Sequence, residues 1–370
     1  MNKTIRTKLI AMLLAAVMAV GLAACGSQSA GSPGIITGPE TGAVTEIPDP
    51  DANSKPWVDL GGWGDTINDK DGDKSPAGSD GHVPGTPRES KPMSRWLQAY
   101  GELTTLVKSV KTPSKPDIKN TKMDNNYGTV DWSTAANGYI TFTAKGQERC
   151  FVLQGPNDKQ TLCTAAKGDT IKIALIDGAG KYQYAIANNT DDGKSYYVQY
   201  KNSFSVSAID SGLAPYLVST PYGDYENAPN AVAKADELWD TSKTQLDNIK
   251  EITHYVTSTL HYDKTLKMGT IDAYVNPDKV IENGGGVCNE LSKTLVAMLR
   301  SQGVPAYYTG GQNAKGQGHA WVMAWLEFSS ETKSGTTKST GAWILIEATG
   351  GGVQTKSTAD KNYTPSNYAG

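Results

Sequence analysis

Hydrophobic positions in the middle of the chain follow a short alternating pattern that is typical of strands. Five runs of aliphatic and aromatic residues are separated by turn signals such as Gly155–Asp158 and Asp177–Gly180. Short strands at this spacing predict a small β-sandwich, which we place as a β-rich accessory domain at residues 126–215. The predicted strands are Tyr139–Phe142, Cys150–Leu153, Thr170–Leu175, Tyr182–Ala187 and Tyr196–Tyr200.

The hydrophobic period changes to that of helices after Pro229. An apolar stripe that runs from Ile249 to Leu260 predicts one helix, and His254 and His261 project away from this stripe. We therefore expect both histidines to be surface residues without a functional role.

A second helix and two strands are predicted farther along the chain. The helix begins at Cys288 and runs to about Ser301, and the strands cover residues 320–328 and 342–348 with a polar stretch between them. Helices followed by antiparallel strands predict an α+β fold for the domain that we place at residues 230–360.

The first residues have the layout of an export signal. A basic start is followed by an apolar run from Leu9 to Ala24, which is shorter than the ~20 residues that span a bilayer. This layout predicts a secretory signal peptide at residues 1–24. The run ends in a stretch that resembles the lipobox of bacterial lipoproteins, Leu22-Ala23-Ala24-Cys25-Gly26.

The lipobox resemblance implies that Cys25 carries a lipid and becomes the first residue of the mature chain. The mature protein would then be exported and lipid-anchored at the extracytoplasmic face of the cell membrane. An ordinary signal peptide followed by a chance cysteine is the alternative.

The segment between the export signal and the accessory domain has few aliphatic side chains to bury. Residues 25–91 are rich in Gly, Pro, Ser, Asp and Thr, which predicts a disordered tether. Residues 92–125 are predicted to form a helix, from Arg95 to Lys111, and a linker.

The net charge of the chain limits the classes of partner that it can bind. The net charge is -3 at pH 7. Because nucleic-acid binding needs a surplus of basic side chains to neutralise phosphates, nucleic acid is excluded as the main partner.

The four cysteines have different predicted roles. Cys25 would carry the lipid. Cys150 and Cys163 flank a turn in the β-rich region of an exported protein, and an oxidising compartment favours a disulfide between them. Cys288 is then left outside any predicted disulfide, and a buried core cysteine is the alternative to a reactive one.

The surroundings of Cys288 favour a nucleophile. The thiol follows Gly284-Gly285-Gly286-Val287 and begins a helix, whose unsatisfied N–H groups and positive dipole end favour a thiolate and could bind an oxyanion. His319 stands at the start of one predicted strand and Glu347 at the end of the next. Adjacent antiparallel strands would set these two side chains side by side, as a base and the group that orients it.

The ordered set of these stretches resembles the transglutaminase-like superfamily, which has a papain-like fold. The resemblance covers about Asn248 to Thr349, and the region from Gly138 onward is similar to the accessory domain of some lipoproteins in this group. The matching stretches are Gly286-Val287-Cys288, Met298 through Ala306, Gly310-Gly311, His319-Ala320-Trp321 and Trp343 through Thr349.

The resemblance implies a catalytic triad of Cys288 as nucleophile, His319 as base and then acid, and Glu347 as the orienting carboxylate. It implies no metal and no other cofactor. One departure is that the family usually has Asp at the third position, so the longer Glu347 must reach the imidazole from a shifted strand or ring.

These inferences predict thiol-dependent acyl transfer on peptide or protein amides of the cell envelope. Cys288 would form a thioester that water resolves in a peptidase or amidase and that a lysine amine resolves in a transglutaminase. The alternative is a catalytically inactive transglutaminase-like surface binding module. In either case we expect a monomer that reaches its partner from the membrane through the tether.

Overall fold

The computed structural model describes residues 81–91, 121–189, 196–266, 274–331, 337–354 and 362–369. The predicted signal peptide, the lipidation site Cys25, the predicted helix from Arg95 to Lys111 and most of the predicted tether lie outside the described residues. Among the described residues, no helix is both long enough and apolar enough to cross a membrane.

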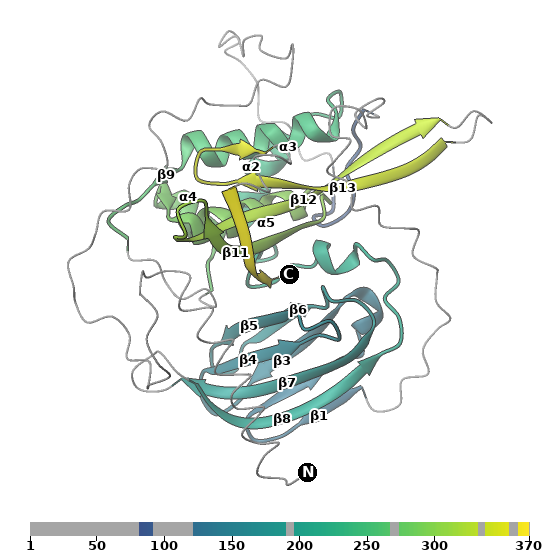
Figure 1. The fold of residues 1–370 in the computed structure, drawn as a ribbon, viewed down its shortest axis with the longest axis vertical. Helices are drawn as coiled ribbons and strands as arrows, with labels where there is room; N and C mark the ends of the chain where they lie inside the picture. The colour runs from purple at the N-terminus through teal and green to yellow at the C-terminus, as the bar shows by residue number, and fades with distance from the viewer. Residues whose placement is uncertain are drawn as a thin grey trace.

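The β-rich region is a sandwich of two four-stranded antiparallel sheets, drawn in blue and teal in Figure 1. All five predicted strands are present, and the described residues add three strands that were not predicted, β1, β2 and β5. One sheet has the order β1 (Lys122–Asp124), β2 (Gly128–Asp131), β3 (Tyr139–Ala144) and β6 (Thr170–Ala174). The other has the order β5 (Gln160–Ala165), β4 (Arg149–Gln154), β7 (Gly180–Asn189) and β8 (Tyr196–Val206).

Alternation along the strands supplies the core of the sandwich. In β3, every second residue is buried, and Phe142 from this strand meets Phe151 from β4 with ring centroids 4.7 Å apart. Because a strand turns alternate side chains to opposite faces, this pattern packs one sheet against the other.

The predicted disulfide between Cys150 and Cys163 is wrong. The two residues lie on neighbouring strands, but the register pairs Cys150 with Thr164 and Phe151 with Cys163. Successive side chains point to opposite faces, so the two sulfur atoms lie on opposite sides of the sheet. Cys163 belongs to the main core, whereas Cys150 belongs to a separate apolar cluster.

The C-terminal region combines helices with a five-stranded sheet, which gives the predicted α+β class. The helices include α2 (Pro229–Leu238), α3 (Gln245–His254), α4 (Pro277–Glu282) and α5 (Cys288–Ser301). A π-helical turn, Tyr255–Thr259, extends α3, and short segments flank the core at Ala135–Asn137 and Ala214–Leu217. The sheet has the order β14 (Gly352–Val353), β13 (Thr337–Glu347), β12 (Gly318–Glu331), β11 (Ala306–Asn313) and β15 (Tyr363–Ala369).

Helix α5 occupies the centre of this region. It begins and ends at the predicted residues and contacts β11, β12, α2 and α3. Even Arg300 is fully buried, because its guanidinium donates to the carbonyl oxygens of Ala306 at 2.8 Å and Val218 at 2.6 Å. The apolar stripe of α3 is buried as predicted, and His254 and His261 are exposed.

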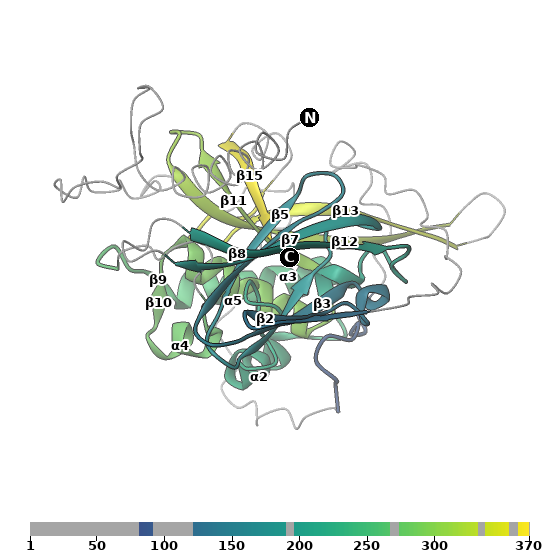
Figure 2. The same cartoon turned by 90° about the horizontal axis from the view of Figure 1, so that it is seen from below.

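The sandwich lies beneath the helical region, and the two share one core. Figure 2, seen from below, places β7 and β8 in front of α3 and α5. The C-terminal strand β15 contacts β5 of the sandwich. The Tyr216 hydroxyl also donates to the Ile176 carbonyl oxygen at 3.2 Å, so the two regions meet through specific polar contacts as well as apolar ones.

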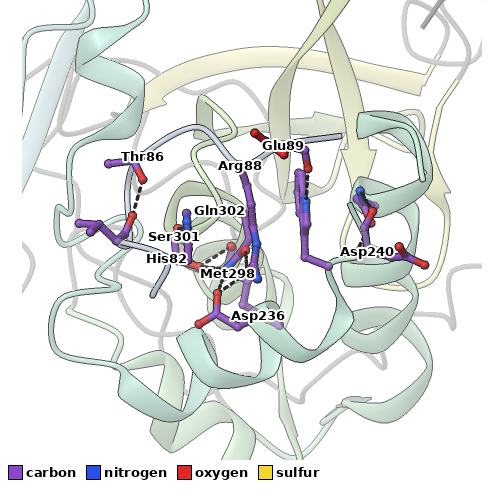
Figure 3. Close-up of polar contacts among 12 residues, drawn as sticks. His82, Thr86, Arg88, Glu89, Asp236, Asp240, Met298, Ser301 and Gln302 are labelled. Carbon is purple, nitrogen blue, oxygen red and sulfur yellow. Dashed lines mark hydrogen bonds and ion pairs between the residues drawn. The ribbon is translucent and has the colours of Figure 1, made fainter. Parts of the chain in front are cut away.

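Residues 81–91 form a strap that lies on the helical region rather than the end of a disordered tether (Figure 3). Gly85 N donates to Ser301 O at 2.9 Å and Lys91 N to Lys243 O at 2.8 Å. Arg88 donates to Asp236 and to Gln302, at 2.7 Å each. The prediction of a disordered tether is wrong for residues 81–91, because polar and backbone hydrogen bonds hold these residues without an apolar run.

Arg88→Ala should lower the free energy of unfolding by about 2 kcal/mol, because Asp236 and Gln302 lose a charged donor at a site where only 10% of the Arg88 side chain is exposed. Urea denaturation measures the change. Lys279→Ala is the control, since its ion pair with Glu282 is exposed and should be worth less than about 1 kcal/mol. Equal effects of the two substitutions would contradict a stabilising role for the strap.

Candidate active site

Cys288 is the first residue of α5, and a short parallel bridge fixes the approach to it. Strand β10 (Gly285–Gly286) pairs with β9 (His261–Tyr262), and Gly284 turns the chain with φ at 72°, a left-handed conformation that favours glycine. The Glu290 carboxylate accepts from Val287 N at 3.2 Å and caps the helix start. The Cys288 side chain is therefore held at a helix N-terminus, and it is only 2% exposed.

His319 and Glu347 meet across two antiparallel strands, as the sequence predicts. Val322 of β12 pairs with Ile346 of β13, so extending this register by one residue places Glu347 opposite Trp321 and diagonal to His319 on the same face. The distance from His319 Nε2 to Glu347 Oε2 is 2.6 Å, and the two side chains are 12% and 9% exposed.

The imidazole of His319 also interacts with Cys288. The His319 side chain is hydrogen-bonded to the Cys288 side chain as well as to Glu347. Since Nε2 bonds the carboxylate, Nδ1 is the nitrogen left for the sulfur. The three residues thus form one hydrogen-bonded series from thiol to ring to carboxylate, which is the arrangement that activates a nucleophile.

The charges of this series stabilise each other. Burial acts to lower the pKa of His319, but the Glu347 carboxylate and the hydrogen bond with Cys288 outweigh it and raise this pKa to about 10. Burial acts to raise the pKa of Glu347, but the charge and hydrogen bonds of His319 and Thr349 outweigh it and lower this pKa. At neutral pH the site therefore holds an imidazolium beside a carboxylate.

Glu347 receives further donors besides His319. Thr349 donates to Oε1 from its backbone N at 3.0 Å and from its hydroxyl at 2.7 Å. The Tyr363 hydroxyl donates to Oε2 at 2.9 Å. The carboxylate that the sequence predicts is thus fixed by residues that sequence reasoning did not single out.

Tyr262 is another residue that was not singled out. Burial and the charge of Cys288 raise the pKa of its hydroxyl, and this hydroxyl also interacts with the Cys288 backbone. It is the last residue of β9, and its place in the stretch Leu260–Asp263 ahead of the nucleophile was the available signal. The hydroxyl therefore stays protonated beside Cys288.

The structure brings together three of the predicted site residues, Cys288, His319 and Glu347, and keeps Cys150 and Cys163 in the sandwich. Cys25 lies outside the described residues. Within the described ranges, no group of three or more His, Cys, Asp or Glu side chains is placed to hold a metal ion.

Comparison with protein families identifies the domain that carries this geometry. Residues 232–348 match the transglutaminase-like superfamily, and this span includes all three residues of the hydrogen-bonded series. The chain therefore contains a transglutaminase-like domain, and its α+β order of helices and antiparallel strands is the fold that the sequence resemblance implied.

Solved structures with some likeness to the chain include three bacterial proteins. A candidate cysteine protease from Cytophaga hutchinsonii is 13% identical, with 62% of this chain and 83% of that chain covered and a TM-score of 0.31. The periplasmic domain of TgpA from Pseudomonas aeruginosa is 15% identical, with 57% and 70% covered and a TM-score of 0.26. A candidate protease from Parabacteroides distasonis is 11% identical, with 63% and 67% covered and a TM-score of 0.25. No curated protein matches the chain.

Proposed function

We propose that the protein is a thiol-dependent acyl-transfer enzyme that acts on peptide or protein amides of the cell envelope. The hydrogen-bonded series of Cys288, His319 and Glu347 carries this proposal. A binding module needs neither a thiol hydrogen-bonded to an imidazole nor a buried carboxylate behind that imidazole, so the geometry favours an enzyme over the inactive alternative.

The first half of the reaction forms a thioester. The Cys288 sulfur, having passed its proton to His319, attacks the substrate carbonyl carbon and forms a C–S bond. The oxyanion of the tetrahedral intermediate lies at the N-terminus of α5, where the Cys288 N–H and the Tyr262 hydroxyl are the nearby donors. His319 then donates its proton to the leaving nitrogen, the C–N bond breaks, and the amine departs.

The second half returns the enzyme to its starting state. His319 takes a proton from the acceptor, which attacks the thioester carbonyl, and the C–S bond breaks to release the Cys288 thiolate beside the protonated His319. With water as acceptor the product is a carboxylic acid, as in a peptidase or amidase. With a lysine amine the product is a new amide, as in a transglutaminase. Glu347 keeps the ring in one orientation and balances its positive charge throughout.

The location in this proposal rests on the first residues of the chain. The basic and apolar start and the lipobox-like end at Cys25 support export and a lipid anchor at the extracytoplasmic face of the membrane. The remaining partner in the proposal is a peptide or protein substrate, and the enzyme acts as a monomer.

Iodoacetamide labelling of the purified protein at a series of pH values tests the proposal. His319 keeps its positive charge below a pKa of about 10 and loses it as the pH rises through that value, so it can stabilise the Cys288 thiolate at neutral pH. We expect alkylation of Cys288 to persist at about pH 6, whereas an ordinary thiol titrates near pH 8.5. In His319→Ala this labelling should fall at least about tenfold.

The controls are present in the same chain. Cys150 and Cys163 are as buried as Cys288 but lie outside the triad, so mass spectrometry of each site separates activation of the thiol from its exposure. Labelling of Cys288 that follows an ordinary thiol titration, with no effect of His319→Ala, would contradict the enzyme and leave the inactive binding module.

A further inference from the structure

We infer that Tyr363, on the C-terminal strand β15, is a positioning residue that holds the Glu347 carboxylate in place for His319. The inference rests on the proposed function and extends the site beyond residues 232–348, which match the superfamily. Its starting point is the hydrogen bond of 2.9 Å from the Tyr363 hydroxyl to Glu347 Oε2, the same oxygen atom that His319 contacts.

Strand β15 delivers this hydroxyl from the edge of the sheet. Among the described strands it pairs only with β11, where Asn313 is opposite Tyr363 and Gly311 is opposite Pro365. Gly311 in turn pairs with His319 of β12. Strands β11 and β12 stand between β15 and the strand that carries Glu347, and the side chains of Tyr363 and Glu347 meet beside the His319 ring.

The Glu347 carboxylate accepts four hydrogen bonds, and Tyr363 supplies one of the two at Oε2. Thr349 holds Oε1 with two bonds, and His319 and Tyr363 hold Oε2 with one each. An ionised carboxylate has about four lone-pair sites, so these donors satisfy it. Glu has one more rotatable bond than Asp, and the extra donor restricts the additional freedom of the longer side chain.

The ring of Tyr363 also packs on the site. Its centroid lies 6.2 Å from that of His319 at an interplanar angle of 27°, and 5.2 Å from that of Trp321. Burial and the nearby Glu347 charge raise the pKa of Tyr363, so the hydroxyl keeps its proton and remains a donor. Since the ring and the hydroxyl contribute separately, Tyr363→Phe removes the hydrogen bond and retains the packing.

The groups that face the His319–Glu347 pair come from four elements. They are Cys288 of α5, Tyr262 of β9, Thr349 after β13 and Tyr363 of β15. Of these, only Thr349 and Tyr363 donate to the carboxylate among the described contacts. A change in the titration of His319 on substitution of Tyr363 therefore reports the position of that carboxylate.

A double-mutant cycle with Glu347→Gln tests the inference. The rate constant for iodoacetamide alkylation of Cys288 is measured in the wild type, Tyr363→Phe, Glu347→Gln and the double variant, with thermal unfolding as the check on folding. We expect Tyr363→Phe to slow alkylation about tenfold, as for loss of a hydrogen bond to a charged group. In the Glu347→Gln background the same substitution should have no further effect.

A second readout does not depend on catalysis. The ring protons of His319, followed by NMR against pH, should titrate about one pH unit lower in Tyr363→Phe, because a less ordered carboxylate attracts the imidazolium less strongly. A merely structural role would leave this titration unchanged. An unchanged His319 titration in Tyr363→Phe, or equal effects of that substitution in both backgrounds, would overturn the inference. If Cys288 of the wild type instead behaves as an ordinary thiol, the proposed function fails and the NMR titration still decides the role of Tyr363.

Discussion

Glu347→Gln should slow alkylation of Cys288 at neutral pH by about 100-fold. The substitution removes the charge that raises the pKa of His319, and its amide has a single oxygen to accept the hydrogen bonds that two carboxylate oxygens now accept. The ring then loses the partner for its positive charge and part of what fixes its orientation, so it stabilises the Cys288 thiolate less. The alkylation rate constant and the titration of His319 measure the loss.

Glu347→Asp is the matched comparison, because Asp is the residue that the family usually has at this position. The shorter side chain cannot span the 2.6 Å bond to Nε2 and keep both Thr349 bonds from the present position of β13. We expect a loss of about tenfold, smaller than for Glu347→Gln since the charge remains. Wild-type reactivity in Glu347→Asp would show that the site is not built around the longer residue.

Gly285→Ala should disable the site through the segment that leads into Cys288. A Cβ at this position would lie 2.1 Å from the carbonyl oxygen of His261, which is backbone and cannot rotate away. The β9–β10 bridge would have to open, and this bridge fixes the turn into Cys288. We expect unfolding to become easier by about 2 kcal/mol and alkylation of Cys288 to slow about 100-fold, since small displacements of reacting groups have effects of this order.

Gly168→Ala is the control for that substitution. Gly168 has φ at 88° in the sandwich, and no atom lies within 4 Å of the position that a Cβ would take, so only backbone strain is added. Urea denaturation should show a loss of about 1 kcal/mol, with Cys288 as reactive as in the wild type. Similar reactivity in Gly285→Ala would contradict the role of the bridge in placing the thiol.

Sequence patterns predicted the centre of the site because they depend on local rules. The cysteine that follows a glycine run and precedes an apolar stripe predicted the start of α5. The alternation along two strands predicted that His319 and Glu347 lie side by side. Both are consequences of the helical and strand periods, which the chain carries in its own residues.

The C-terminal strand could not be predicted in this way. Pro365 argues against a central strand, and β15 is an edge strand, where proline is tolerated. Its partner β11 contains Gly310 and Gly311, which have low strand propensity. Since β15 is defined by its pairing with another segment rather than by its own pattern, Tyr363 was missed.

The errors in the β-rich region and the tether have similar causes. A shift of one residue in the β4–β5 register would place Cys150 opposite Cys163, and sequence spacing does not determine that register. The strap was assigned to the tether because composition counts aliphatic residues, whereas one arginine and a few backbone N–H groups hold it in place.

The strap also determines which part of the domain a pulling force on the N-terminal side of residue 81 acts on first. It binds at Ser301, the last residue of α5, while Cys288 is the first, and 14 residues of helix separate these ends by about 21 Å. Any object attached ahead of residue 81 therefore pulls on the end of the central helix that is remote from the sulfur atom. The strap and its contacts with Ser301 bear such tension first, and these residues are separate from the pairing of β12 with β13, where the imidazole and carboxylate meet.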